Sequence, residues 1–315
     1  MRIITKFMRK FLWHKYKVAY RKRLVGLPYP PREFWIEPTN HCNLRCVMCP
    51  HGKGLHVQKG YMDMELYSKI IDELKGLNVQ RINLFLGGES LLHKNLVEMI
   101  AMARDSKIPV RLHTNAAILP EDMAIRLLES GGIEEISFSF DGEEKDYYER
   151  VRVNAKFEKT LANIRRFLEV KKSRGLRIPR VLVQVIKERK ADGSTPAISD
   201  KFKALFAGLP VDKFHPICFH NFGGTLEVTG DVRYEVFKKE YKPCHQPWRS
   251  MSISWNGEVV GCCLDMEKKL ILGDLRTQGV REVWNAKPMK ELRRALAEGR
   301  YADIELCREC DQLWI

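Results

Sequence analysis

The chain has 315 residues, of which 44% are hydrophobic and 30% charged, a composition typical of a globular protein with a sizeable core. No stretch approaches the ~20 apolar residues that a membrane-spanning helix needs, and the N-terminus lacks the pattern of a secretory signal. We therefore expect a cytoplasmic protein, in which nine cysteines do not form a disulfide framework.

The N-terminal segment carries much of the net charge of +14, because residues 1–25 hold nine Lys or Arg and no acid. Apolar side chains recur there at helical spacing: Ile4, Phe7, Met8, Phe11, Leu12, Tyr16 and Ala19. Residues 1–33 are predicted to be a basic amphipathic arm, with Pro28, Pro30 and Pro31 ending its helix. We favour a helix that packs its apolar stripe on its own domain, with peripheral membrane contact through residues 1–25 as the alternative.

Strands and helices alternate over residues 34–220. Strands are predicted at 34–38, 81–90, 109–115, 133–142, 180–186 and 211–219, and helices at 62–77, 93–106, 121–130, 157–173 and 199–207. Such alternation indicates βαβ units and a parallel sheet, whose active site lies where the strands end. After residue 225 the pattern changes to a hairpin at 250–265, turning at Asn256-Gly257, and a helix at 281–298.

Eight of the nine cysteines fall into two groups, which favours metal binding in a reducing compartment. The first is Cys42, Cys46 and Cys49; the second is Cys244, Cys262, Cys263, Cys307 and Cys310; Cys218 stands alone. The first group, with Cys-x3-Cys-x2-Cys spacing, is one thiolate short of a tetrahedral zinc site, which His41 or His51 would have to complete. Three close thiolates can instead hold three corners of an iron–sulfur cubane and leave one iron open.

The segment "CNLRCVMCP" resembles the cluster-binding loop of the radical S-adenosylmethionine (SAM) superfamily. This resemblance implies a partial (β/α)6 barrel over residues 34–225. It also implies that Cys42, Cys46 and Cys49 bind a [4Fe–4S] cluster whose open iron takes SAM, reduced by an external donor such as flavodoxin or ferredoxin. Met48 stands where the family often has an aromatic residue near the adenine, and we expect it to fill that place.

Further motifs follow in the family's order. "GGES" (87–90) resembles a Gly-Gly-Glu-Pro segment that contacts the SAM amino group. "HTN" (113–115) resembles a segment that lines the same pocket, and "SFDG" (139–142) resembles a segment near the ribose. The resemblance assigns SAM contacts to Gly87, Gly88, Glu89, Ser90, Asn115 and Ser139, and the SAM carboxylate to Arg152. Ser90 replaces the family's usual proline.

The second cysteine group is similar to the SPASM/twitch extension of radical SAM enzymes, with Cys-x12-Gly-x4-Cys from Cys244 to Cys262. The resemblance implies a small α+β domain over residues 226–315 that holds one auxiliary [4Fe–4S] cluster. Its ligands would be Cys244, Cys262, Cys307 and Cys310, which leaves Cys263 spare. The same four thiolates also suit zinc.

We predict a radical SAM oxidoreductase or epimerase that acts on a small polar molecule such as a sugar or aminocyclitol. The alternative is a peptide-modifying enzyme that crosslinks, epimerises or oxidises residues. RNA modification and a non-enzymatic scaffold are weaker alternatives, and nucleic acid is not expected as a partner, because no additional RNA-binding fold is visible. The candidate hydrogen donors are Cys263 and Cys218, and the candidate bases are Asp265, Glu89 and His220.

Overall fold

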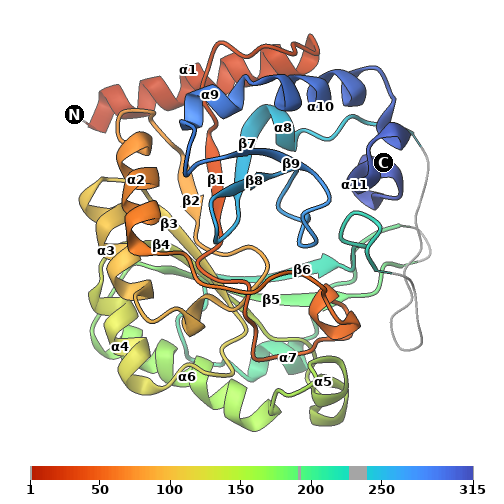
Figure 1. The fold of residues 1–315 in the computed structure, drawn as a ribbon. Helices are drawn as coiled ribbons and strands as arrows, with labels where there is room; N and C mark the ends of the chain where they lie inside the picture. Colours follow the sequence, from red (N-terminus) through yellow and green to blue (C-terminus); the bar gives the residue numbers. More distant parts are fainter. Residues whose placement is uncertain (1, 191–192, 227–239, 315) are drawn as a thin grey trace.

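A computed structural model describes the backbone of residues 2–190, 193–226 and 240–314, and side chains from residue 10 onward (Figure 1). The described strands form one nine-stranded sheet in the order β6-β5-β4-β3-β2-β1-β7-β8-β9. Their bounds are β1 Glu33–Ile36, β2 Arg81–Asn83, β3 Val110–Thr114, β4 Ile133–Ser139, β5 Arg180–Lys187, β6 Lys213–Cys218, β7 Ser250–Ile253, β8 Glu258–Val260 and β9 Ile271–Asp274.

Strands β1 to β6 are parallel and lie in sequence order, which is the arrangement of an open (β/α)6 barrel and confirms the predicted fold class. The helices between them are α2 Met64–Leu74, α3 Leu96–Asp105, α4 Glu121–Glu129, α5 Lys145–Val151, α6 Phe157–Ser173 and α7 Asp200–Ala204, on the outer side of the curved sheet (Figure 1). Asp63 caps α2, accepting a hydrogen bond from the Leu66 N–H at 2.8 Å. Helix α5 was not predicted.

The C-terminal strands continue the same sheet. Strand β7 pairs in parallel with β1, and β8 and β9 follow antiparallel. The predicted hairpin is confirmed, and Gly257 adopts a φ of 97° in its turn, a conformation that favours glycine. Strand β9 was not predicted. The division of the chain at residue 225 stays a prediction, and residues 227–239 lie outside the described part.

The predicted helix over residues 281–298 is wrong in one respect, because it is two helices, α9 Val280–Trp284 and α10 Lys287–Ala297. Pro288 lies in the first turn of α10, where its missing N–H breaks no helical hydrogen bond. At the break, the Asn285 side chain exchanges two hydrogen bonds of 2.9 Å with the Leu27 backbone. The interruption therefore joins the C-terminal region to the N-terminal arm.

Helix α1 (Arg2–Arg21) lies beside α9 and α10 (Figure 1). Tyr16 and Ala19 are buried, which confirms the predicted packing of the apolar stripe at these two positions, whereas Phe11 remains 45% exposed. The Tyr20 hydroxyl donates a 2.5 Å hydrogen bond to the Pro243 carbonyl, close to the C-terminal cysteine group. Within the described residues, no helix is long and apolar enough to span a bilayer. Contact of the arm with a membrane surface stays a prediction.

Candidate active site

A cavity of ≈ 340 Å³ lies at the ends of the parallel strands, where sequence reasoning placed the motif loops. Among the predicted site residues, its lining includes Cys42, Cys46, Met48, Cys49, Gly87, Gly88, Glu89, Asn115, Ser139, Arg152, Cys263 and His220. Its lining also includes residues that the motif reasoning missed, among them Trp35, Phe85, Arg111 and Gln184. One space therefore joins the three-cysteine loop to a cysteine of the second group.

Backbone contacts fix the shape of the three-cysteine loop. The N–H groups of Arg45 and Val47 donate to the carbonyls of Val153 and Val151, both at 3.0 Å, so the end of α5 and the residues just after it support the loop. A Cβ on Gly52 would lie 2.2 Å from the Cys46 carbonyl oxygen, so only glycine fits there. The loop is thus held in one conformation by its neighbours.

All three loop cysteines are free thiols on the cavity wall. Burial raises the pKa of Cys42 to about 11 and that of Cys49 to about 12, and it also raises the pKa of Cys46. Buried thiolates need a neighbouring positive charge, which metal ions provide outright. Three soft sulfur donors on one wall fit an iron–sulfur cluster, whose thiolates are spread over separate irons.

The GGES segment packs directly against this loop. The Glu89 N–H donates to the His41 carbonyl at 2.8 Å, and a Cβ on Gly88 would lie 2.3 Å from the Thr39 carbonyl oxygen. The Gly87 carbonyl oxygen lies 2.5 Å from Nε2 of His51, just after the third cysteine. Gly88 is therefore required by the close approach of two backbones, whereas a Cβ on Gly87 would lie 2.6 Å from Oε1 of Glu37.

The Glu89 side chain is buried, and its two oxygens accept hydrogen bonds from the N–H groups of Leu91 (3.1 Å) and Asn115 (2.8 Å). Burial raises the pKa of this carboxyl. Ser90 is not in the cavity lining, because its hydroxyl donates to the Leu84 carbonyl at 2.8 Å. Glu89 thus ties the end of β2 to the end of β3, while Ser90 stabilises the turn from behind.

Arg152 is buried and forms a two-pronged ion pair with Asp141, with Nε and Nη2 lying 2.7 and 2.6 Å from Oδ2. Its Nη1 lies 3.9 Å from Sγ of Cys46. Asp141 is the aspartate of the SFDG motif, to which the sequence reasoning gave no role of its own. It holds Arg152 beside the cysteine loop and also accepts the Ile186 N–H at 2.6 Å.

Asn115 and Ser139 complete this wall. Nδ2 of Asn115 donates to Oδ1 of Asn43 in the cysteine loop at 3.0 Å, and Oδ1 of Asn115 accepts the Ala117 N–H at 2.9 Å. The Ser139 hydroxyl is hydrogen-bonded to Nε2 of His113 on β3. Burial, followed by the nearby Arg111 and Arg152, lowers the pKa of His113 to about 3, so this ring is neutral at physiological pH.

In the second cysteine group, burial raises the pKa of Cys262, Cys263, Cys307 and Cys310, and the charge of Cys244 adds to this rise. The Leu264 N–H donates to Sγ of Cys262 at 3.4 Å, and Cys262 does not line the cavity. Sγ of the adjacent Cys263 lies 3.9 Å from the Gln246 amide nitrogen and does line it. The two adjacent cysteines therefore face different surroundings.

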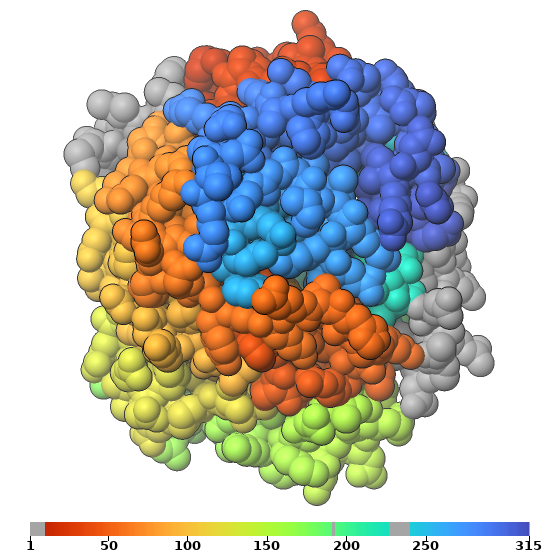
Figure 2. Space-filling model, viewed as in Figure 1, coloured from red at the N-terminus to blue at the C-terminus, as the bar shows by residue number. Residues whose placement is uncertain are grey.

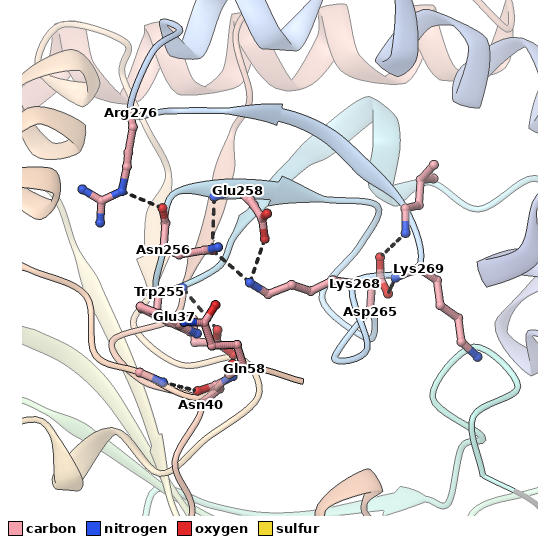
Figure 3. Close-up of polar contacts among 12 residues, drawn as sticks. Glu37, Asn40, Gln58, Trp255, Asn256, Glu258, Asp265, Lys268, Lys269 and Arg276 are labelled. Carbon is pink, nitrogen blue, oxygen red and sulfur yellow. Dashed lines mark hydrogen bonds and ion pairs between the residues drawn. The ribbon is translucent and has the colours of Figure 1, made fainter. Parts of the chain in front are cut away.

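The other two candidate catalytic residues lie outside the cavity lining. Asp265 is buried, and its carboxylate accepts the N–H groups of Gly261 (3.4 Å), Lys269 (2.8 Å) and Leu270 (3.1 Å), so it organises a turn (Figure 3). Sγ of Cys218 lies 3.3 Å from the Thr195 hydroxyl. Of the residues proposed as hydrogen donors, Cys263 is the one that the structure brings to the cavity.

Glu37, just after β1, connects the GGES segment with the C-terminal hairpin. Its buried carboxylate accepts the Gly87 N–H at 3.0 Å with Oε1. Its Oε2 accepts the Trp255 N–H at 3.2 Å (Figure 3). Next to it, Lys268 binds Asn256 and Glu258 across the hairpin. Figure 2 shows the segment that follows the cysteine loop packed directly against this hairpin.

Two family patterns match the chain. The Radical SAM superfamily matches residues 36–187, and the iron-sulfur cluster-binding domain named SPASM matches residues 244–311. Together the two matches cover most of the chain and contain both cysteine groups.

Curated relatives include two kinds of protein. Over 281 residues, the chain is 21% identical to the S-adenosyl-L-methionine-dependent 2-deoxy-scyllo-inosamine dehydrogenase of Niallia circulans, an alignment covering 88% of this chain and 92% of that protein. Over 122 residues it is 31% identical to the PqqA peptide cyclase of Granulibacter bethesdensis, covering 39% of this chain and 32% of that protein. The chain therefore spans the first relative nearly fully and about a third of the second.

Solved structures of similar fold include BtrN in complex with AdoMet and 2-DOIA, with a TM-score of 0.58, 21% identity, and coverage of 89% of this chain and 92% of BtrN. They also include Streptococcus suis SuiB bound to the precursor peptide SuiA, with a TM-score of 0.69, 13% identity, and coverage of 95% of this chain and 74% of SuiB. At these identities the similarity is one of fold.

Proposed function

The chain belongs to the radical SAM superfamily and carries a SPASM domain, and from this membership we propose that it cleaves SAM reductively to act on a small polar molecule. The proposed reaction is oxidation or epimerisation at one carbon of a substrate such as a sugar or an aminocyclitol. The observation that carries the proposal is the single cavity onto which the three-cysteine loop, the GGES segment and Cys263 all open.

The proposed ligands of the SAM-binding [4Fe–4S] cluster are Cys42, Cys46 and Cys49. When bound, this cluster and SAM supply the electron and the 5′-deoxyadenosyl radical that abstracts hydrogen from the substrate. Flavodoxin or ferredoxin is the proposed external electron donor. The protein's own task is to orient the cofactors and to exclude water.

Three groups of the chain orient SAM in this proposal. The closely packed backbone of Gly87 and Gly88 approaches the amino group, and Glu89 fixes that backbone through Leu91 and Asn115. Arg152, held by Asp141, presents its remaining Nη1 group toward the SAM carboxylate and Cys46. Met48 and Ser139 would line the adenosine side of the same cavity.

Cys244, Cys262, Cys307 and Cys310 are the proposed ligands of one auxiliary cluster, which supplies an acceptor for an electron from the substrate. Cys263 remains protonated in this proposal and can return a hydrogen atom to the substrate in an epimerisation; the thiyl radical that this leaves would be restored to the thiol by an electron from the proposed external donor and a proton. For an oxidation, His220 is the proposed base, since it lines the cavity and burial lowers its pKa.

Modification of a ribosomal peptide is the second candidate. The similarity in fold to SuiB bound to its precursor peptide, and the sequence similarity to PqqA peptide cyclase, favour it. The dehydrogenase of Niallia circulans matches this chain over nearly the full length of both proteins, and we therefore place the small molecule first.

The test is anaerobic reconstitution with iron and sulfide, followed by incubation with SAM and a reductant. Mass spectrometry should detect 5′-deoxyadenosine from the native protein. The variant with Cys42, Cys46 and Cys49 all replaced by alanine should form none. A variant carrying Cys218→Ala serves as the matched control, because this thiol lies outside both groups. Equal product from the triple variant and the control would overturn the proposal.

A further inference from the structure

The proposed SAM and cluster ligands leave part of the cavity lining unassigned. Trp35 on β1, Phe85 after β2, Arg111 on β3 and Gln184 on β5 all line it. The rings of Trp35 and Phe85 meet edge to face with centroids 5.1 Å apart. The burial pattern of β3 alternates, so Arg111 and His113 share the strand face that points to the cavity. These residues form a second chemical environment beside the proposed SAM site.

Positive charge is in excess around Arg111. Its Nε forms a 2.8 Å ion pair with Glu135, but Glu135 also binds Arg180. A second carboxylate, Glu33, is likewise shared between two arginines, Arg81 at 3.3 Å and Arg249 at 2.6 Å. Two carboxylates thus face four guanidinium groups. Because each arginine stays charged in this setting, the group as a whole carries a surplus of positive charge.

The other charges on the cavity wall do not balance this surplus. In the described lining, Glu89 is the acid and Arg111 and Arg152 are the cations. The Glu89 oxygens already accept two backbone N–H groups, and Arg152 is neutralised by Asp141. The Arg111 side chain keeps 21% exposure, and within the described part of the chain its ion pair engages Nε alone. Its two Nη groups are therefore open to a ligand.

We propose that the substrate is a small molecule carrying an anionic group, a carboxylate or a phosphate, that Arg111 binds in this cavity. The inference rests on the proposed function and narrows its substrate class. A guanidinium matches either anion with two parallel N–H donors. Trp35 and Phe85 offer apolar faces to the carbon skeleton. A protonated amine would be repelled here, so sugar acids and sugar phosphates are favoured over aminocyclitols.

Two variants separate recognition from folding. Arg111→Met leaves Glu135 paired with Arg180, and Arg180→Met leaves it paired with Arg111, so neither leaves an unpaired buried carboxylate. Arg180 is the matched control because it shares the same partner but is absent from the cavity lining and 61% exposed. Thermal unfolding and iron content of both holoenzymes establish that each variant is folded and loaded.

The experiment measures 5′-deoxyadenosine formation by the holoenzyme with SAM and reductant. Small-molecule extract of the source cells is separated on an anion exchanger, and the retained and flow-through fractions are added in turn. The retained fraction should stimulate 5′-deoxyadenosine formation by the native enzyme and by Arg180→Met. The stimulation of Arg111→Met should be at least tenfold smaller. The native protein and Arg180→Met should cleave SAM equally without extract.

Each other result has a defined meaning. The inference is overturned if the stimulating compound is in the flow-through fraction, or if Arg111→Met is stimulated as fully as the native enzyme. It is also overturned if no fraction stimulates SAM cleavage. Loss of SAM cleavage from the native protein itself would instead overturn the proposed function. Treating the retained fraction with a phosphatase distinguishes the two anions, since a phosphate-bearing substrate loses its activity and a carboxylate-bearing one keeps it.

Discussion

Replacing Glu37 by glutamine tests whether the C-terminal hairpin and the SAM-binding segment are physically joined. The carboxylate of Glu37 accepts two buried backbone N–H groups, from Gly87 at 3.0 Å and Trp255 at 3.2 Å. Glutamine keeps one acceptor oxygen and places an NH2 group where the other was. One N–H, of Gly87 or of Trp255, would then face a second donor.

The size of the effect follows from these two contacts. A hydrogen bond to a charged group contributes about 1.5–3 kcal/mol, and a buried donor left without a partner costs about 1–3 kcal/mol. Burial raises the pKa of the Glu37 carboxyl, and this partly offsets the loss because a neutral amide is cheaper to bury than a carboxylate. We therefore expect Glu37→Gln to lower the free energy of unfolding by about 2–4 kcal/mol.

Urea unfolding monitored by tryptophan fluorescence measures this difference, and calorimetry of the cluster-loaded protein measures SAM affinity. SAM should bind at least fivefold more weakly, because the Gly87 backbone would lose its fixed position. Glu258→Gln is the matched control, since Glu258 pairs with Lys268 on the same hairpin at its partly exposed side and should change stability by under about 1 kcal/mol. If Glu37→Gln behaves like this control in both measurements, the coupling argument fails.

Three further changes have defined outcomes. Cys46→Ala should lower the iron content by one cluster and abolish SAM cleavage; retained cleavage would contradict its role. Cys307→Ala should also lower the iron content by one cluster, yet leave substrate-free SAM cleavage intact. Loss of SAM cleavage together with that cluster would show that the two cysteine groups are not independent. Asp141→Asn should destabilise the protein by about 3–5 kcal/mol in urea, because Arg152 would be left as a buried charge without its partner; a shift below about 1 kcal/mol would contradict this.

The local features of the fold could be predicted from sequence because they repeat over short distances. Segments with the apolar pattern of a strand alternate with segments that have the apolar pattern of a helix, and this predicted six parallel strands. The Asn256-Gly257 pair predicted the hairpin. The break at Asn285 was missed although Pro288 signals it, since a proline cannot donate the N–H that a continuous helix would need there; the bonds between Asn285 and Leu27 stabilise the break. Strand β9 was missed for a similar reason, since its four residues are a strand only when β8 lies beside them.

The residues of the candidate site likewise fall into those that the sequence predicted and those that it did not. Motif spacing predicted the cysteines and glycines that line the cavity, because their roles depend on a local loop shape. The pairing of Arg152 with Asp141 and the shared partners of Arg111 depend on which strands are neighbours. Ser90 was assigned through the resemblance of the GGES segment and Asp265 was a candidate base, and the structure shows both side chains bonded to backbone outside the cavity lining. Proximity along the chain did not specify the direction of a side chain.

The position of β1 explains why Glu37 can reach both regions. Strand β1 has β2 on one side and β7 on the other, and all three are parallel. The segments that follow these strands must therefore emerge at the same edge of the sheet, with the segment after β1 between the other two. Glu37 is the first residue of that central segment, so its carboxylate has Gly87 on one side and Trp255 on the other. A chain that ended before β7 would leave the edge of β1 unpaired and Glu37 with one partner. The C-terminal strands are thus part of the scaffold that positions the candidate SAM site.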